Sequence, residues 1–386
     1  PACGEKGILD IVFDYSEIKR VFSKETLKKD SNNSMWRYRA LMPLVGDGLD
    51  DFLRIGWTPL YRSLRLGKQI GLDTLYIKDD GLNPTGSLKD RASGVAVAKA
   101  IELGYDTIAC SSTGNAASSC AGNAARMGLK TVIFVPERAP MGKVAQLLIF
   151  GANVISVKGD YRQTFELSKA AIEKWGFYNR NAGINPILTE GKKTVALEIA
   201  EQLDWNPTDW VAVSVGDGCT IGGVYNGFYD LYQLGMIERI PKILGVQSTG
   251  CCPFVDANER GGELMPTPEN TLADSIAVGV PRNPVKAQRA VKNSGGKWIA
   301  VSDDEILEAM RLLGRSEGVF GEPAGVTATA GVVKAVANGL IRSNESVTVI
   351  STGSGLKDVK NAMLAAGEPF KCEPDIKALE ASGRIH

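Results

Sequence analysis

Asn83-Pro84-Thr85-Gly86-Ser87-Leu88-Lys89-Asp90-Arg91 places a lysine where a strand gives way to a helix. Residues 75–78 read as a short strand, and Pro84 and Gly86 indicate a tight turn. The Ala- and Val-rich residues 92–103 predict a helix that stops at Gly104, with Ser87 as a suitable N-cap. In the first helical turn, the positive end of the helix dipole favours a neutral lysine amine. Such an amine can form a Schiff base with an aldehyde or ketone, although an ordinary surface lysine fits the same pattern.

Three further predicted strands end in small and hydroxyl-bearing residues. Ser112-Thr-Gly-Asn-Ala-Ala117 follows 107–111, Gly216-Asp-Gly-Cys-Thr220 follows 210–215, and Thr352-Gly-Ser-Gly355 follows 347–351. Glycines in such loops let backbone N–H groups converge on an anion at a helix N-terminus. Neither of the first two loops matches the GxxxxGK[ST] or the GxGxxG pattern. One lysine and three such strand ends suit a cofactor with an aldehyde, a phosphate and a ring nitrogen, and pyridoxal phosphate has all three.

The motifs Asn-Pro-Thr-Gly-Ser-Leu-Lys-Asp-Arg, Ser-Thr-Gly-Asn and Thr-Gly-Ser-Gly-Leu-Lys-Asp together resemble those of threonine synthase. That family contains fold-type II pyridoxal-phosphate enzymes of the tryptophan synthase β superfamily. The resemblance extends from about Met35 to Gly367, which is most of the chain. It implies an α/β fold with two lobes of parallel or mixed sheet covered by helices, and a cofactor in the cleft between the lobes.

Length and pattern agree with a two-lobed α/β protein. A chain of 386 residues is comfortable for two domains. Predicted strands and helices alternate, which favours parallel sheets covered by helices. We expect an N-terminal arm at 1–56, a large cofactor domain at 57–92 plus 193–386, and a small domain at 93–192. Residues 8–15 read as a strand, and the long loop at 251–285 is expected to cover the cleft.

Composition narrows the partners and the compartment. The chain has 44 basic and 44 acidic residues, which implies no nucleic-acid or membrane-surface partner. With no signal peptide and no run of 18 apolar residues, we expect a cytoplasmic protein, and we also expect a homodimer. The seven cysteines are scattered, as free thiols would be. Pro1-Ala-Cys-Gly4 resembles half of a CPxCG zinc knuckle, but one thiol predicts no metal site.

The resemblance implies a role for each motif. Lys89 would hold the cofactor aldehyde, Asn115 would meet its phenolic oxygen, and Thr352 would face its ring nitrogen. Glu322-Pro-Ala-Gly325 matches a segment that the family places beside the ring. The cofactor phosphate would lie among Gly216, Asp217, Gly218, Cys219 and Thr220. The substrate carboxylate would lie among Ser112, Thr113, Gly114, Asn115 and Ala116.

The shortage of histidine points to Lys89 as the acid–base group. His386 is the only histidine and ends the chain, so a Ser-His-Asp or Cys-His arrangement is excluded. The lysine amine is the group best placed to transfer protons during loss of the α-proton and departure of a β- or γ-group.

Some residues depart from the threonine synthase pattern. Leu188 takes the place of an arginine that, in the family, binds the phosphate of phosphohomoserine. Asp217 replaces an asparagine, Ala116-Ala117 replaces two hydroxyl residues, and Lys192 replaces a glutamine and adds a positive charge. Leucine cannot replace a bidentate guanidinium, and a carboxylate repels a phosphate. The changes at Leu188, Asp217 and Ala116-Ala117 favour a small, non-phosphorylated amino-acid substrate, with Leu188 and Asp217 among the residues around it, whereas Lys192 would supply a compensating charge.

Four interpretations remain open. The first is a threonine-synthase-like lyase or synthase that performs β- or γ-elimination or replacement on that non-phosphorylated substrate. The second is threonine synthase itself, which converts O-phospho-L-homoserine and water to L-threonine and phosphate. The third is a threonine or serine ammonia-lyase. The fourth is a non-catalytic pyridoxal-phosphate binder, which the joint presence of Lys89, Asn115 and Thr352 disfavours.

Overall fold

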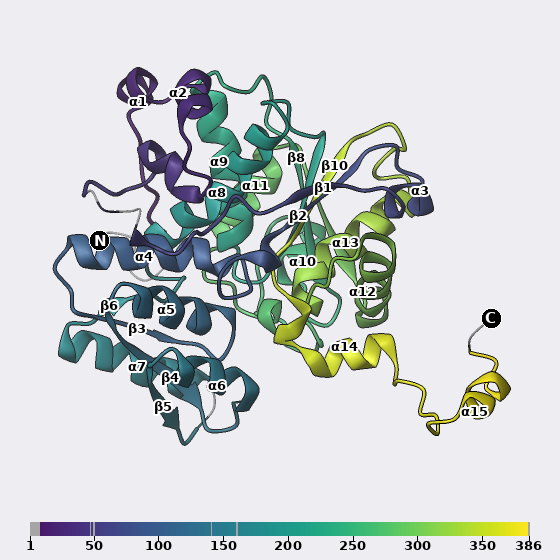
Figure 1. Cartoon of the computed structure of the whole chain (residues 1–386). Helices are drawn as coiled ribbons and strands as arrows, with labels where there is room; N and C mark the ends of the chain where they lie inside the picture. Colours follow the sequence, from purple (N-terminus) through teal and green to yellow (C-terminus); the bar gives the residue numbers. More distant parts are fainter. Residues whose placement is uncertain (1–7, 47, 49–50, 140, 160, 385–386) are drawn as a thin grey trace.

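Two sheets organise the computed structural model, which describes residues 8–46, 48, 51–139, 141–159 and 161–384 (Figure 1). The larger sheet has the strand order β1-β2-β10-β7-β8-β9. All of its neighbouring strands are parallel except β1, which pairs antiparallel with β2. Its strands are β1 (Leu60–Arg62), β2 (Leu75–Asp79), β7 (Trp210–Ser214), β8 (Lys242–Ser248), β9 (Lys297–Val301) and β10 (Val347–Ser351).

The smaller sheet is wholly parallel, in the order β5-β4-β3-β6. It contains β3 (Thr107–Ser111), β4 (Lys130–Pro136), β5 (Asn153–Val157) and β6 (Tyr178–Asn179). Helices α4 (Lys89–Glu102), α5 (Asn115–Arg126), α6 (Met141–Ile149) and α7 (Tyr161–Trp175) pack around it. Parallel strands need helical crossovers, which is why strand and helix alternate here.

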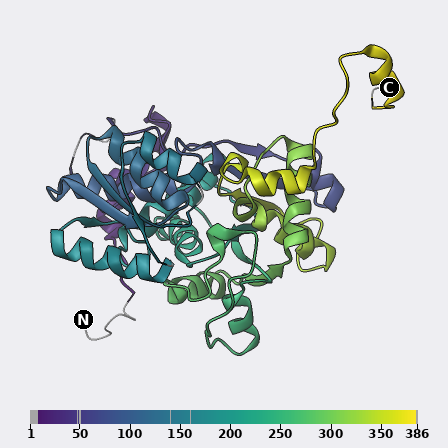
Figure 2. The ribbon, with the colours of Figure 1, turned by 90° about the horizontal axis from the view of Figure 1, so that it is seen from below.

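The larger sheet is covered by a second group of helices (Figures 1 and 2). They are α8 (Ile187–Gln202), α9 (Cys219–Gln233), α10 (Pro253–Glu259), α11 (Pro284–Asn293), α12 (Asp303–Glu317), α13 (Pro323–Ala337) and α14 (Val359–Ala366), with α3 (Leu66–Ile70) at one edge. Helix α8 is wedged between α4 and α9. A Cβ at Gly191 would collide with the carbonyl oxygen of Arg91, and one at Gly227 would lie 2.5 Å from that of Lys193. This close packing brings the helix of Lys89 and the helix that follows the 216–220 loop against one common neighbour.

The terminal segments differ in how they meet the body. Residues 8–46 carry α1 (Tyr15–Val21), α2 (Lys24–Lys29) and the 3-10 segment η2 (Met35–Leu41). Asp10 pairs with Lys286 at 3.1 Å and with Arg289 at 2.8 Å, which attaches this arm to α11. After α14, the chain extends away from the body and ends in α15 (Ile376–Ala381), as Figures 1 and 2 both show. None of the described helices is long and apolar enough to cross a membrane.

Most predicted strands and helices are confirmed, and the strand at 8–15 is wrong. Residues 8–14 form neither strand nor helix, and Tyr15 begins α1. The reason is a local cap: Asp14 Oδ1 accepts hydrogen bonds from the backbone N–H groups of Ser16 at 2.9 Å and Glu17 at 3.3 Å. The Asp14 carboxylate thus accepts hydrogen bonds from N–H groups that have no partner within the first turn of a helix. This capping favours a helix over an extended strand.

The N-cap of α4 differs from the predicted one. Leu88, not Ser87, precedes the first residue of α4, and the buried hydroxyl of Ser87 has no hydrogen-bond partner. The turn is instead held by Asp90, whose carboxylate accepts hydrogen bonds from Thr85 N at 2.8 Å and Thr85 Oγ1 at 2.9 Å.

The predicted domain limits stay a prediction. The strands of the small sheet lie between 93 and 192, but residues 92 and 192 fall inside α4 and α8.

Candidate active site

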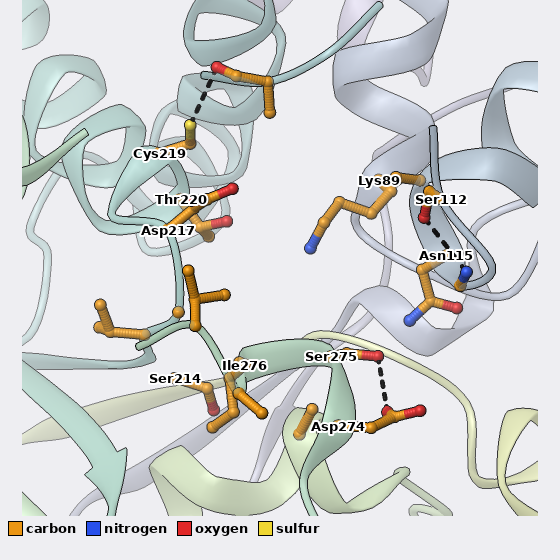
Figure 3. Close-up of a pocket in the computed structure, with 18 of the residues that line it drawn as sticks. Lys89, Ser112, Asn115, Ser214, Asp217, Cys219, Thr220, Asp274, Ser275 and Ile276 are labelled. Carbon is orange, nitrogen blue, oxygen red and sulfur yellow. Dashed lines mark hydrogen bonds between the residues drawn. The ribbon is translucent and has the colours of Figure 1, made fainter. Parts of the chain in front are cut away.

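A pocket of about 570 Å³ lies where the strand-to-helix junctions of both sheets meet. Lys89, Thr352 and residues 111–116 and 214–221 line it, together with parts of 269–282. In Figure 3, Lys89 points across the pocket toward the wall that carries Asp217, Cys219 and Thr220. Parallel α/β sheets place ligands at the carboxyl ends of their strands, as here.

Lys89 is the first residue of α4 and is partly buried, with its side chain directed into the pocket (Figure 3). Burial, with the charge of Lys192 acting in the same direction and that of Glu322 against it, lowers the pKa of Lys89 to about 8. At pH 7 about one amine in ten is therefore neutral, against less than about one in a thousand for an ordinary lysine. Among the described residues, its Nζ has no hydrogen-bond or ion-pair partner. The amine is thus available for an aldehyde.

The loop at 216–220, called the glycine loop below, opens α9. Gly218 has φ +89°, and a Cβ there would lie 2.6 Å from the carbonyl oxygen of Asn283. Two of the loop's side chains are held by the wall behind it. Asp217 Oδ1 accepts a hydrogen bond from Arg282 N at 3.1 Å, and Cys219 Sγ donates to the carbonyl oxygen of Ala182 at 3.3 Å. The first-turn N–H groups of α9 remain for an anion in the pocket.

The second helix start, at residues 112–116, precedes and opens α5. Gly114 is the N-cap of α5, and Ser112 Oγ accepts a hydrogen bond from its N–H at 3.1 Å (Figure 3). Asn115 Nδ2 donates to Glu322 Oε1 at 2.6 Å, which joins this loop to the start of α13. The loop's free N–H groups suit a carboxylate.

Thr352 follows β10 and also lines the pocket. Its carbonyl oxygen accepts a hydrogen bond from Leu88 N at 2.8 Å. The end of β10 and the residue before Lys89 are therefore held together by the backbone.

The structure brings together all the predicted site residues except Leu188. Leu188 is fully buried and is not among the residues that line the pocket, and its predicted place beside the substrate stays a prediction. Lys192, one helical turn further along α8, does line it. A leucine in α8 packs into the core between neighbouring helices, whereas the longer lysine reaches the pocket.

Sequence reasoning missed two groups of pocket residues. Arg180 and Asn181 follow β6, a two-residue strand too short to recognise by pattern. Arg282 and residues 274–278 come from the long loop, which was expected over the cleft but without individual roles. The position of Arg180 at the carboxyl end of a parallel strand was the signal available.

These residues fit pyridoxal phosphate. The unpaired Lys89 amine suits its aldehyde, and the glycine loop, where Gly218 leaves no room for a side chain, suits its phosphate. Arg180 and Lys192 add positive charge to the same pocket. For the zinc knuckle, residues 1–7 lie outside the described part of the chain, and the described residues hold no cluster of metal-ligating side chains.

Comparisons with known proteins support this reading. The family model "Pyridoxal-phosphate dependent enzyme" matches residues 52–353. The threonine synthase of Methanocaldococcus jannaschii is 41% identical over 382 residues, covering 98% of this chain and 93% of that protein. The threonine synthase of Mycobacterium tuberculosis H37Rv is 37% identical over 327 residues, covering 84% and 89%.

Solved structures show the same fold. The processed form of threonine deaminase isoform 2 from Solanum lycopersicum aligns with TM-score 0.71 at 22% identity, covering 88% of this chain and 95% of that one. Diaminopropionate ammonia lyase from Escherichia coli aligns with TM-score 0.71 at 20% identity, covering 90% and 93%. The predicted fold class, cofactor and enzyme class are confirmed. The chain therefore belongs to the pyridoxal-phosphate-dependent enzyme family, as a threonine-synthase-like member of fold type II.

Proposed function

We propose that this protein is a threonine synthase, which converts O-phospho-L-homoserine and water to L-threonine and phosphate. The observation that carries the proposal is a buried guanidinium in the pocket. Arg180 is 2% exposed, and its Nε and Nη2 each donate to Ser93 Oγ at 3.0 Å. No carboxylate of the described residues forms an ion pair with it. A buried cation without an acidic partner is costly, and a planar guanidinium suits a phosphate.

Two of the features that argued for a non-phosphorylated substrate weaken in the structure. Leu188 does not line the pocket, so the positive charge that a substrate phosphate needs would come from other residues. Asp217 is engaged by the Arg282 backbone N–H, and its Oδ2 lies 3.8 Å from Arg282 Nη1. A carboxylate held by a guanidinium repels a nearby phosphate less than a free one. The relatives that cover most of the chain carry the name threonine synthase, which agrees with this choice.

The chain's residues divide the work by position. When bound, pyridoxal phosphate supplies an electron sink for the substrate's α-carbon. Lys89 Nζ accepts and returns protons, since the described part of the chain has no histidine. The N-terminus of α5 binds the substrate carboxylate, and Arg180 holds its phosphate until that group leaves. Thr352, which lines the pocket, would meet the ring nitrogen with a neutral hydroxyl and so would leave that nitrogen largely uncharged. The homodimer, the cytoplasmic compartment and the domain limits remain further proposals.

The experiment compares Arg180→Gln with the unchanged protein on phosphohomoserine. Losing one charge-assisted contact to the substrate phosphate costs about 1.5–3 kcal/mol, so KM should rise about 10- to 150-fold. The matched control is Arg282→Gln, because Arg282 already has Asp217 as its partner, and it should raise KM less. Equal KM for all three proteins would remove Arg180 from the substrate site. A panel of homoserine, threonine, serine and O-acyl amino acids then identifies any non-phosphorylated substrate.

A further inference from the structure

Two neighbouring lysines of α8 are both buried, but only one has a partner. Lys193 Nζ lies 2.6 Å from Glu190 Oε2 and 2.6 Å from Asp230 Oδ2. Lys192 is 2% exposed and lines the pocket, and within the described ranges it has no hydrogen bond or ion pair. A buried ammonium without a partner is unfavourable, so Lys192 is a side chain built to meet an anion.

The packing of α8 on α9 locates that anion. A Cβ at Gly223 would lie 2.9 Å from the carbonyl oxygen of Thr189 and 3.1 Å from Lys192 Cβ. Gly223 is one helical turn beyond Cys219, the first residue of α9. The Lys192 side chain therefore starts beside the first turn of α9 and enters the pocket next to the glycine loop.

Other charges around Lys192 are already engaged. Lys286, whose Cβ would meet one at Gly222, pairs with Asp10 at 3.1 Å. Asp217 is held by Arg282, and Arg180 is the cation proposed above for the substrate phosphate. Burial lowers the pKa of Lys192, with the charges of Arg180 and Lys286 acting in the same direction and those of Cys219 and Asp217 against it. An arriving dianion would stabilise the ammonium form.

We propose that Lys192 is the cation that pairs with the phosphate of pyridoxal phosphate at the N-terminus of α9. The sequence predicted a phosphate site made of small residues and backbone N–H groups, without a positive side chain. In the proposed site a lysine from α8 joins the first-turn N–H groups and the positive end of the α9 dipole. This inference rests on the cofactor and not on the identity of the substrate.

The test separates the phosphate from the rest of the cofactor. Cofactor-free protein is titrated with pyridoxal phosphate and with pyridoxal, which lacks the phosphate, and binding to Lys89 is followed by absorbance. In Lys192→Gln the affinity for pyridoxal phosphate relative to pyridoxal should fall about 10- to 100-fold, as for one charge-assisted contact, and the pyridoxal arm corrects for the effect of the lost Lys192 charge on Lys89. Arg180→Gln is the matched control, since it removes another buried cation of the pocket and should leave the preference for pyridoxal phosphate intact.

Each outcome decides the question. An unchanged preference for pyridoxal phosphate in Lys192→Gln overturns the proposal. If KM for phosphohomoserine then rises, Lys192 serves the substrate phosphate instead. If the variant fails to fold, phosphorus NMR of the unchanged holoenzyme answers: the cofactor phosphate should stay dianionic well below its ordinary pKa of about 6. Titration of that phosphate near pH 6 would equally overturn the assignment. Failure of the threonine synthase activity alone would leave this inference intact.

Discussion

Lys89 is the residue that we propose as the cofactor lysine, and its lowered pKa makes its reactivity depend on pH. A pKa lowered to about 8 means that the reactive neutral amine is gained as pH rises through 8. We predict that cofactor-free protein reacts with pyridoxal phosphate about 25 times faster at pH 8.5 than at pH 6.5, and only slightly faster above pH 9. Stopped-flow absorbance measures this rate.

The attachment point itself is checked by reduction. Borohydride treatment of the holoenzyme followed by peptide mapping should leave the pyridoxyl label on Lys89. Lys357 is the informative competitor, because it lies nearby but donates to Ser118 Oγ at 2.9 Å and Gln146 Oε1 at 2.8 Å. A label on Lys357 or Lys78 would contradict the assignment.

At the residue scale, the sequence placed Lys89 at the start of a helix, as observed, but could not show whether Leu188 lines the pocket. A turn, a helix start and a family motif indicate this lysine, and all three are local signals. Whether a side chain of α8 faces the core or the pocket depends on three packed helices, which no local pattern records. Arg180 was missed for a related reason, since its strand β6 has only two residues.

The glycine loop is the element whose backbone conformation matters most. Gly218 combines φ +89° with a Cβ site 2.6 Å from a carbonyl oxygen, so any side chain is both strained and crowded. We predict that Gly218→Ala loses about 1–3 kcal/mol of stability and weakens cofactor binding. Gly114→Ala is the matched control: φ is −107°, and its Cβ would meet only Ser275 Oγ at 3.8 Å. Chemical denaturation measures the stability of both variants. Equal losses of stability would show that the crowding at Gly218 is relieved.

Helices α4 and α8 are joined under the pocket by buried charges. Arg91, two residues after Lys89, lies 2.7 Å from Asp80 Oδ2 and 2.5 Å from Glu198 Oε1, and Lys78 lies 2.7 Å from Glu198 Oε2. Burial alone would raise the pKa of Glu198, but Arg91 and Lys78 lower it to about 2. This carboxylate therefore contributes stability that is present above about pH 4.5 and is lost as pH falls toward 2.

Removing the guanidinium should expose that dependence. We predict that Arg91→Met costs about 3–5 kcal/mol at pH 7, because two buried carboxylates lose their main partner. The cost should shrink between pH 4.5 and pH 3, as Glu198 becomes protonated in the variant. Urea unfolding across this pH range is the measurement. A cost independent of pH would mean that lost packing, not charge, explains the change.

Helix α8 also shows why pattern reading fails for some elements. Residues 188–200 are all buried, so the helix has no polar face and no amphipathic period. Three of its charged residues, Glu190, Lys193 and Glu198, suggest a surface segment but are paired inside the protein. By contrast, β3 was predicted at its observed bounds, because a short apolar run between loops is a local signal.

At the scale of the whole molecule, the pocket forms where two sheets present their strand ends to each other. Residues from 89, 111–116, 180–182, 214–221, 269–282 and 352 meet there, although 263 positions separate the first from the last. The sequence indicated the two lobes through alternating strands and helices. The contribution of the long loop, and the fit of the N-terminal arm against α11, could not be derived from spacing.

The proposal that this pocket acts on phosphohomoserine is tested by measuring the products that the protein forms from it. Purified holoenzyme is supplied with O-phospho-L-homoserine, and inorganic phosphate and threonine are quantified over time. We expect phosphate and threonine in a one-to-one ratio at a typical enzyme rate, about 1–1,000 per second. No release of phosphate, together with turnover of serine, threonine or another non-phosphorylated amino acid, would contradict it.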